Sequence, residues 1–100
     1  MGTKNNPGKF DCYENAEPDE PMFVLLGRDP LAAHLVSLWS KIRMGDMAAA
    51  SAVFLHMMHE HGIAYSVEPD IDKAAEAMDC SLAMFKSREV REAAKITARK

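Results

Sequence analysis

The sequence has few of the residues from which disulfide frameworks and phosphate-binding loops are built. It contains two cysteines and five glycines in 100 residues, and the glycines are isolated from one another. Isolated glycines do not make the glycine-rich loop that cradles phosphate groups. Since nothing in the chain points outside the cell, we expect Cys12 and Cys80 to be free thiols in a reducing cytoplasm.

Long apolar runs and an excess of basic residues are also missing. No apolar run reaches the roughly 18 residues of a membrane helix, and no secretory signal is apparent, so we expect no membrane association. Twelve Lys and Arg residues are outnumbered by fifteen Asp and Glu residues, and the formal net charge is −3. Nucleic-acid-binding domains usually have a basic excess, so we expect no direct nucleic-acid binding.

Apolar residues recur at helical spacing in three segments. Asp29 and Pro30 predict the start of a first helix that ends near Gly45, and Asp46 predicts the cap of a second helix that ends at Gly62. The third helix opens at Pro69 and Asp70, and Ser87 separates it from a weaker terminal helix. We therefore expect a mainly α fold, a small bundle of three to four helices. Its predicted core comprises Leu35, Trp39, Phe54, Met78, Leu82 and Phe85.

The amino-terminal part has no helical period. We expect residues 1–9 to be a flexible tip and residues 10–100 to form a single helical domain. Pro18 and Pro21 disfavour helix at the preceding residues, which predicts an extended arm. The apolar run 22–26 fits a strand that pairs across subunits, an arm that lies against helices, or a helical turn opened by Pro21.

Charge is unevenly distributed along the chain. The segment 11–20 contains five acidic residues and no basic one, whereas the segment 86–100 is mostly basic. One interpretation is that the two ends lie near each other or are simply solvated. The other is that the acidic segment meets a charged partner. The hypothetical partner-binding residues are Asp11, Glu14, Glu17, Asp19, Glu20 and Arg28.

One cluster has the composition of a metal site. His56, His59 and Glu60 would be neighbours on a helix, and imidazole and carboxylate groups bind zinc. Histidines are also favoured near helix ends because their charge complements the helix dipole, and we prefer this structural role. Neither cysteine has a neighbourhood that activates a thiol, since acidic residues lie beside both of them. The sequence thus predicts neither an enzyme nor a cofactor.

The segment 10–39 carries a distinctive pattern. It consists of a Cys-Tyr pair at Cys12, a Pro-Asp-Glu-Pro-x-Phe-Val-Leu-Leu run from Pro18, an Arg-Asp-Pro triplet at Arg28 and a tryptophan at Trp39. The pattern resembles small proteins encoded by bacteriophages and prophages, a group that includes anti-CRISPR inhibitors. This resemblance implies a phage-encoded inhibitor that acts in the host bacterial cytoplasm. It would bind a host defence complex, most simply a CRISPR surveillance ribonucleoprotein, by protein–protein contact.

Two other functions stay open at this point. The first is a structural or regulatory phage protein that acts as a homo-oligomer, with residues 22–26 paired between subunits. The second is a metal-binding protein that uses His56, His59 and Glu60.

Overall fold

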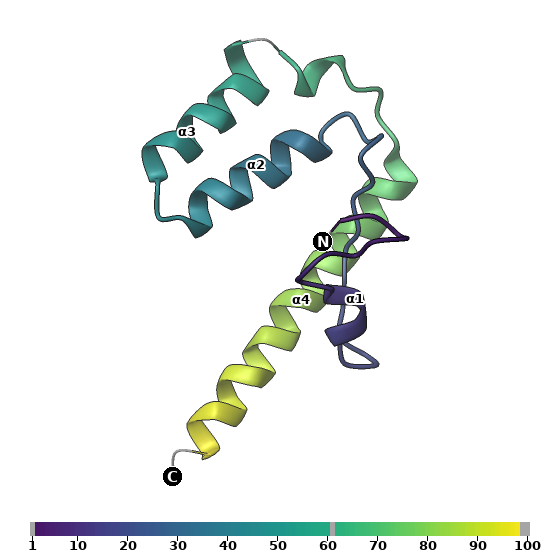
Figure 1. The fold of residues 1–100 in the computed structure, drawn as a ribbon, viewed down its shortest axis with the longest axis vertical. Helices are drawn as coiled ribbons and strands as arrows, with labels where there is room; N and C mark the ends of the chain where they lie inside the picture. Colours follow the sequence, from purple (N-terminus) through teal and green to yellow (C-terminus); the bar gives the residue numbers. More distant parts are fainter. Residues whose placement is uncertain (1, 61, 99–100) are drawn as a thin grey trace. The chain divides into compact units, whose positions relative to one another are not determined.

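The computed structural model describes residues 2–60 and 62–98, apart from the side chain of Glu60. The described chain is mainly α and contains no strand, which confirms the predicted fold class (Figure 1). Its elements are α1 (Cys12–Asn15), α2 (Ala32–Arg43), α3 (Met47–Leu55), the π-helix η1 (His56–Glu60), the 3₁₀ helix η2 (Ala64–Ser66) and α4 (Ile71–Ala98).

The chain divides into two compact units. One unit combines Met1–Phe23 with Ala74–Lys100, and the other is Val24–Lys73. The single domain over residues 10–100 and the flexibility of residues 1–9 both stay predictions. Within that tip, Thr3 and Asn6 form a turn in which each backbone amide donates to the other residue's carbonyl oxygen.

The unit Val24–Lys73 is built on the helical hairpin of α2 and α3, which run antiparallel side by side (Figure 1). Gly45 ends α2 with a φ of +80°, a conformation that glycine adopts without strain. Its amide donates to the carbonyl oxygen of Ile42, and the amide of Asp46 donates to that of Lys41. Two carbonyl groups that the end of the helix leaves without a helical partner are thus satisfied. The Asp46 carboxylate then accepts from the amide of Ala49 at 3.0 Å and caps α3. The predicted end of the first helix near Gly45 and the predicted cap at Asp46 are thus both confirmed.

Two helix boundaries differ from the sequence prediction. The first helix begins at Ala32 because Asp29 accepts from the amide of Leu31 at 2.9 Å, which closes a turn ahead of the helix. The second helix does not continue as an α-helix to Gly62. Its backbone changes at His56 to the wider π-helix η1.

The buried core lies in this unit and is small. Ala32, Ala50 and Met57 are only 3–5% exposed, and they are the described residues classed as buried. The predicted core is therefore largely wrong. Leu35 is half-buried, whereas Trp39 and Phe54 are exposed. A helical period identifies an apolar face but does not say whether another element covers it.

Helix α4 begins at the end of this unit and continues into the other as one helix through Ser87, so the predicted break there is wrong. Its start agrees with the sequence, since Asp70 accepts from the amide of Lys73 at 3.1 Å. None of its residues is buried, and Leu82 and Phe85, two of the predicted core residues, are 59% and 67% exposed. Met78, a third predicted core residue, is exposed as well.

The amino-terminal segment lies along α4. The thiol of Cys80 donates to the carbonyl oxygen of Met22 at 3.3 Å, which ties the two together. The backbone over residues 20–26 is neither helix nor strand, so a strand at this position is not found. Of the three interpretations of this run, the arm against a helix agrees with the Met22 contact.

We predict that Met57 stabilises the hairpin far more than an exposed methionine does. Met57→Ala removes a buried side chain and should lower the free energy of unfolding by about 2–5 kcal/mol. Met44→Ala is the matched control, because Met44 is 70% exposed and its loss should cost less than about 0.5 kcal/mol. Chemical denaturation followed by circular dichroism measures both. Equal losses would contradict a core centred on Met57.

Candidate functional site

The candidate site is the acidic arm, which we define as residues 11–20. Its position rests on one cation of α4. The Arg91 guanidinium lies 2.9 Å from a Glu17 carboxylate oxygen and 3.5 Å from a Glu20 carboxylate oxygen. Glu20 also accepts from the amide of Glu17 at 3.1 Å and donates its own amide to the Glu17 carbonyl oxygen. Arg91 and this small loop thus hold the arm against the helix.

A third carboxylate of the arm shapes its local structure. Asp11 accepts from the amide of Glu14 at 3.2 Å and caps the single turn of α1. Aspartate is among the best N-cap residues because its side chain satisfies an amide that has no partner in the helix. Sequence reasoning missed this turn, although an aspartate followed three residues later by a glutamate is a recognisable start signal.

The five acids therefore fall into two groups. Asp11, Glu17 and Glu20 make the contacts that fold the arm. Glu14 and Asp19 have exposed side chains, and no ion pair joins either of them to another described residue. An exposed carboxylate without a cation partner keeps its full charge available to a second molecule. Glu14 and Asp19 are consequently the strongest binding candidates of the predicted set.

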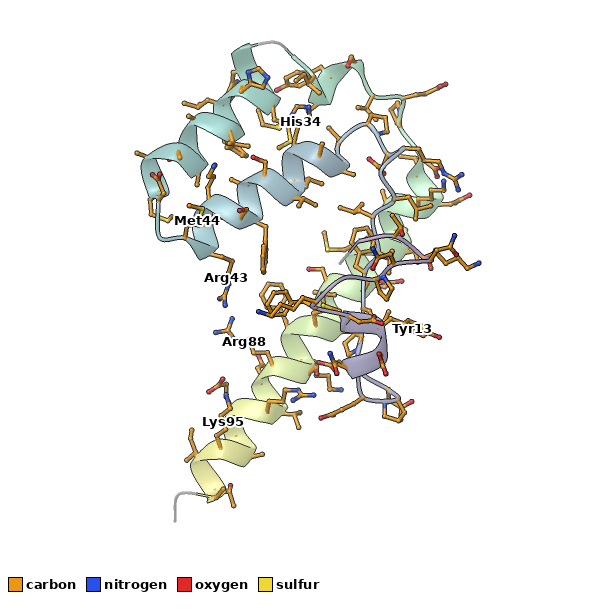
Figure 2. The ribbon with its side chains drawn as sticks, viewed as in Figure 1. Tyr13, His34, Arg43, Met44, Arg88 and Lys95 are labelled. Atoms are coloured by element: carbon orange, nitrogen blue, oxygen red, sulfur yellow. The ribbon has the colours of Figure 1, made fainter. Side chains whose placement is uncertain are left out.

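Among the described residues, Arg91 is the basic residue of the tail that pairs with the acidic front. Lys95 lies 3.4 Å from Glu92 on its own helix instead. Arg88 projects from α4, and no ion pair joins it to the described residues (Figure 2). Arg99 and Lys100 lie outside the described residues.

Arg28, the sixth predicted site residue, belongs to the other unit. It is exposed in the turn that precedes α2. Within the unit that contains the arm, all of the predicted binding residues are therefore acidic.

Aromatic side chains accompany the acids, and sequence reasoning did not select them. Tyr13 lies in α1 next to Glu14 and is 81% exposed (Figure 2). Phe10 is exposed as well, with the Lys9 ammonium 5.5 Å from its ring centre. Exposed tyrosine is enriched among the residues that dominate protein–protein binding energies. The signal was present in the sequence as a tyrosine among acidic residues.

The histidine cluster is arranged differently from the prediction. His56 and His59 belong to η1, where the π-helical backbone does not have the α-helical spacing on which the cluster was predicted. The Glu60 side chain lies outside the described part. His56 instead lies beside His34 of α2, with ring centres 5.9 Å apart. Among the described residues, no three His, Cys, Asp or Glu side chains form a metal-binding group.

The thiols agree with the prediction. Cys12 and Cys80 are both free, the first exposed and the second half-buried. Among the described helices, none is long and apolar enough to cross a membrane.

Comparison of the chain with protein-family models, curated proteins and solved structures finds no match. The grounds for a function are therefore the geometry of the arm and the sequence pattern.

We predict that Arg91 fixes the arm without contributing much to global stability. Arg91→Ala should lower the free energy of unfolding by only about 0.2–1 kcal/mol, because both pairs are exposed to solvent. The backbone of residues 17–20 should nevertheless become mobile on the nanosecond timescale, seen as lower ¹⁵N heteronuclear NOE values. Arg88→Ala is the matched control and should leave these values unchanged. An equal effect of both variants would contradict the role of Arg91.

We also expect the histidines to be structural. Purified protein should contain no stoichiometric zinc by elemental analysis, and a chelator should leave the melting temperature unchanged. Zinc that survives dialysis at one equivalent, lost in a His56→Ala variant, would instead support the metal-binding alternative.

Proposed function

We propose that this protein is a phage-encoded inhibitor that binds a host defence complex through its acidic arm, most simply a CRISPR surveillance complex in the host cytoplasm. The observation that carries the proposal is that Tyr13, Glu14 and Asp19 of the arm are all exposed, and that no ion pair joins either acid to another described residue. The resemblance of residues 10–39 to phage accessory proteins supplies the biological setting.

Charge supports a nucleic-acid-binding channel as the surface that the arm contacts. A surveillance complex holds nucleic acid in channels lined with basic residues, and a protein that presents carboxylates can occupy such a channel. Complementary charge accelerates association and suppresses wrong partners. Glu14 and Asp19 would provide this attraction, and Tyr13 would provide the apolar contact area on which affinity depends.

The contacts within the arm support the same role. A flexible segment loses conformational entropy when it binds, and a segment already held in its bound shape loses less. Arg91 on α4 and the Asp11 cap on α1 both restrict the arm before any partner arrives. The carboxylates that hold the arm and those that are available for binding are different residues, so binding need not break the arm's own contacts.

The proposal predicts that charge reversal at the two available acids abolishes inhibition. The variant is Glu14→Lys with Asp19→Lys. The matched control is Glu68→Lys with Glu76→Lys, which changes the net charge equally at exposed acids outside the arm. The readout is the plating efficiency of a targeted phage on strains that each carry one active CRISPR type and express the chain. Only the arm variant should lose protection of the phage.

Binding kinetics to the purified complex of the protected strain test the mechanism. The arm variant should associate at least about tenfold more slowly at low salt, and the difference should shrink as salt screens the charges. Its melting temperature should stay unchanged, because exposed substitutions usually alter stability by less than about 0.5 kcal/mol. Full inhibition by the arm variant, or no protection by the natural chain in any strain, would contradict the proposal.

A further inference from the structure

Helix α4 carries two different faces in the unit that contains the arm. One face contacts the arm through Cys80 and Arg91. The other carries an apolar stripe, which we define as Ala74, Ala75, Met78, Leu82, Phe85, Ala93 and Ile96. With 100° between successive residues, all seven fall within a sector of about 100°, which also contains Glu89. Arg91 and Cys80 lie on the opposite side of the helix. The four large side chains of the stripe are all 57–67% exposed.

The positions in the stripe are symmetric along the helix. Leu82 and Phe85 lie at equal distances on either side of the point between Ala83 and Met84. Ala74 and Ala93 are symmetric about the same point. A second copy of α4, laid antiparallel on this stripe, therefore places its Phe85 opposite Leu82 and its Leu82 opposite Phe85. A twofold homodimer interface requires a patch that is complementary to itself in this way.

Charge along α4 selects the antiparallel arrangement. The amino-terminal half of the helix carries Glu76 and Asp79, whereas the carboxyl-terminal half carries mainly cations. An antiparallel pair places unlike halves together, and a parallel pair places like halves together. Asp79 and Lys86 favour the antiparallel arrangement locally, because they border the same edge of the stripe about two turns apart. In the antiparallel pair each Asp79 faces the Lys86 of the other copy.

A groove along the stripe offers a place for a side chain of the second copy. It is lined by Phe85, Arg88, Glu89, Glu92, Ala93 and Ile96. The same symmetry places Met78 of the second copy opposite Glu89, at this groove. Methionine is flexible and polarizable and fills irregular apolar spaces well.

We propose that the apolar stripe of α4 is a self-association surface, on which two copies of this chain pair antiparallel about a twofold axis between Ala83 and Met84. The occupant is a second copy because both the apolar positions and the charges are complementary to themselves. The proposal does not depend on the inhibitor function, since it rests on the stripe and on the charges beside it and not on the acids of the arm.

The first test is sedimentation velocity of the full chain over a range of concentrations. We expect a reversible dimer with a dissociation constant of about 1–100 µM, as suits a stripe with few large anchors. Leu82→Glu should leave the chain monomeric at every concentration while its helical circular dichroism is unchanged. Glu68→Lys, an exposed change that lies outside α4, is the control and should dimerise like the natural chain.

Charge reversal tests the orientation. Asp79→Lys alone places two lysines together, and Lys86→Glu alone places two carboxylates together, so each variant should dimerise at least about tenfold more weakly. The double variant Asp79→Lys with Lys86→Glu restores two unlike pairs and should dimerise like the natural chain. An equimolar mixture of the two single variants should form heterodimers for the same reason.

Two results would overturn the proposal. The first is a monomer at millimolar concentration for the natural chain. The second is a dimer that Leu82→Glu leaves intact, since the stripe would then be no part of the interface. A double variant as weak as the single variants would overturn the antiparallel arrangement, because a parallel pair gains nothing from exchanging the two charges.

Discussion

The placement of the acidic arm depends on one guanidinium group. The arm has little apolar area of its own to pack, because five of its ten residues are acidic and Pro18 disfavours helix at the residue before it. Arg91 draws Glu17 and Glu20 to a single point on α4, and the Cys80 thiol holds the backbone further along at Met22. Exposed ion pairs are individually weak, so this attachment orders the arm but is weakened by salt and by competing charges.

The same helix explains why the chain buries so little. An isolated helix is only marginally stable in water, and most helices gain their stability when an apolar face packs against something. The contacts that hold the amino-terminal segment on α4 are the ion pairs at Arg91 and the hydrogen bond of the Cys80 thiol, which are polar. Leu82 and Phe85 remain exposed. The hairpin obtains its stability differently, since Ala32 and Ala50 are small enough to be buried where Met57 completes the core.

Local signals in the sequence predicted local structure well. Asp46 and Asp70 cap helices because a carboxylate satisfies amides within the next turn, and Gly45 ends α2 because its φ is positive. The predictions that were wrong concern features that depend on other parts of the chain. The helix continues through Ser87 because nothing nearby competes for its backbone, and no sequence period says which apolar face is covered. The acidic arm was selected for its charge, and its role as a binding surface stays a prediction. Which of its acids are paired with a cation depends on Arg91, which lies far away in the sequence.

The basic residues of α4 thus have two distinct tasks, and their positions around the helix separate them. Arg91 lies on the face that holds the arm, where its charge is already matched by two carboxylates. Lys86 borders the apolar stripe, where the charge available to match it is Asp79 of a second copy. If two chains pair in this way, each keeps its own arm, and the dimer presents two acidic surfaces. Two linked surfaces that bind one extended basic channel raise the effective concentration of the second contact, provided that the channel spans both arms. A weak interface along the stripe could therefore strengthen a binding surface that it does not touch.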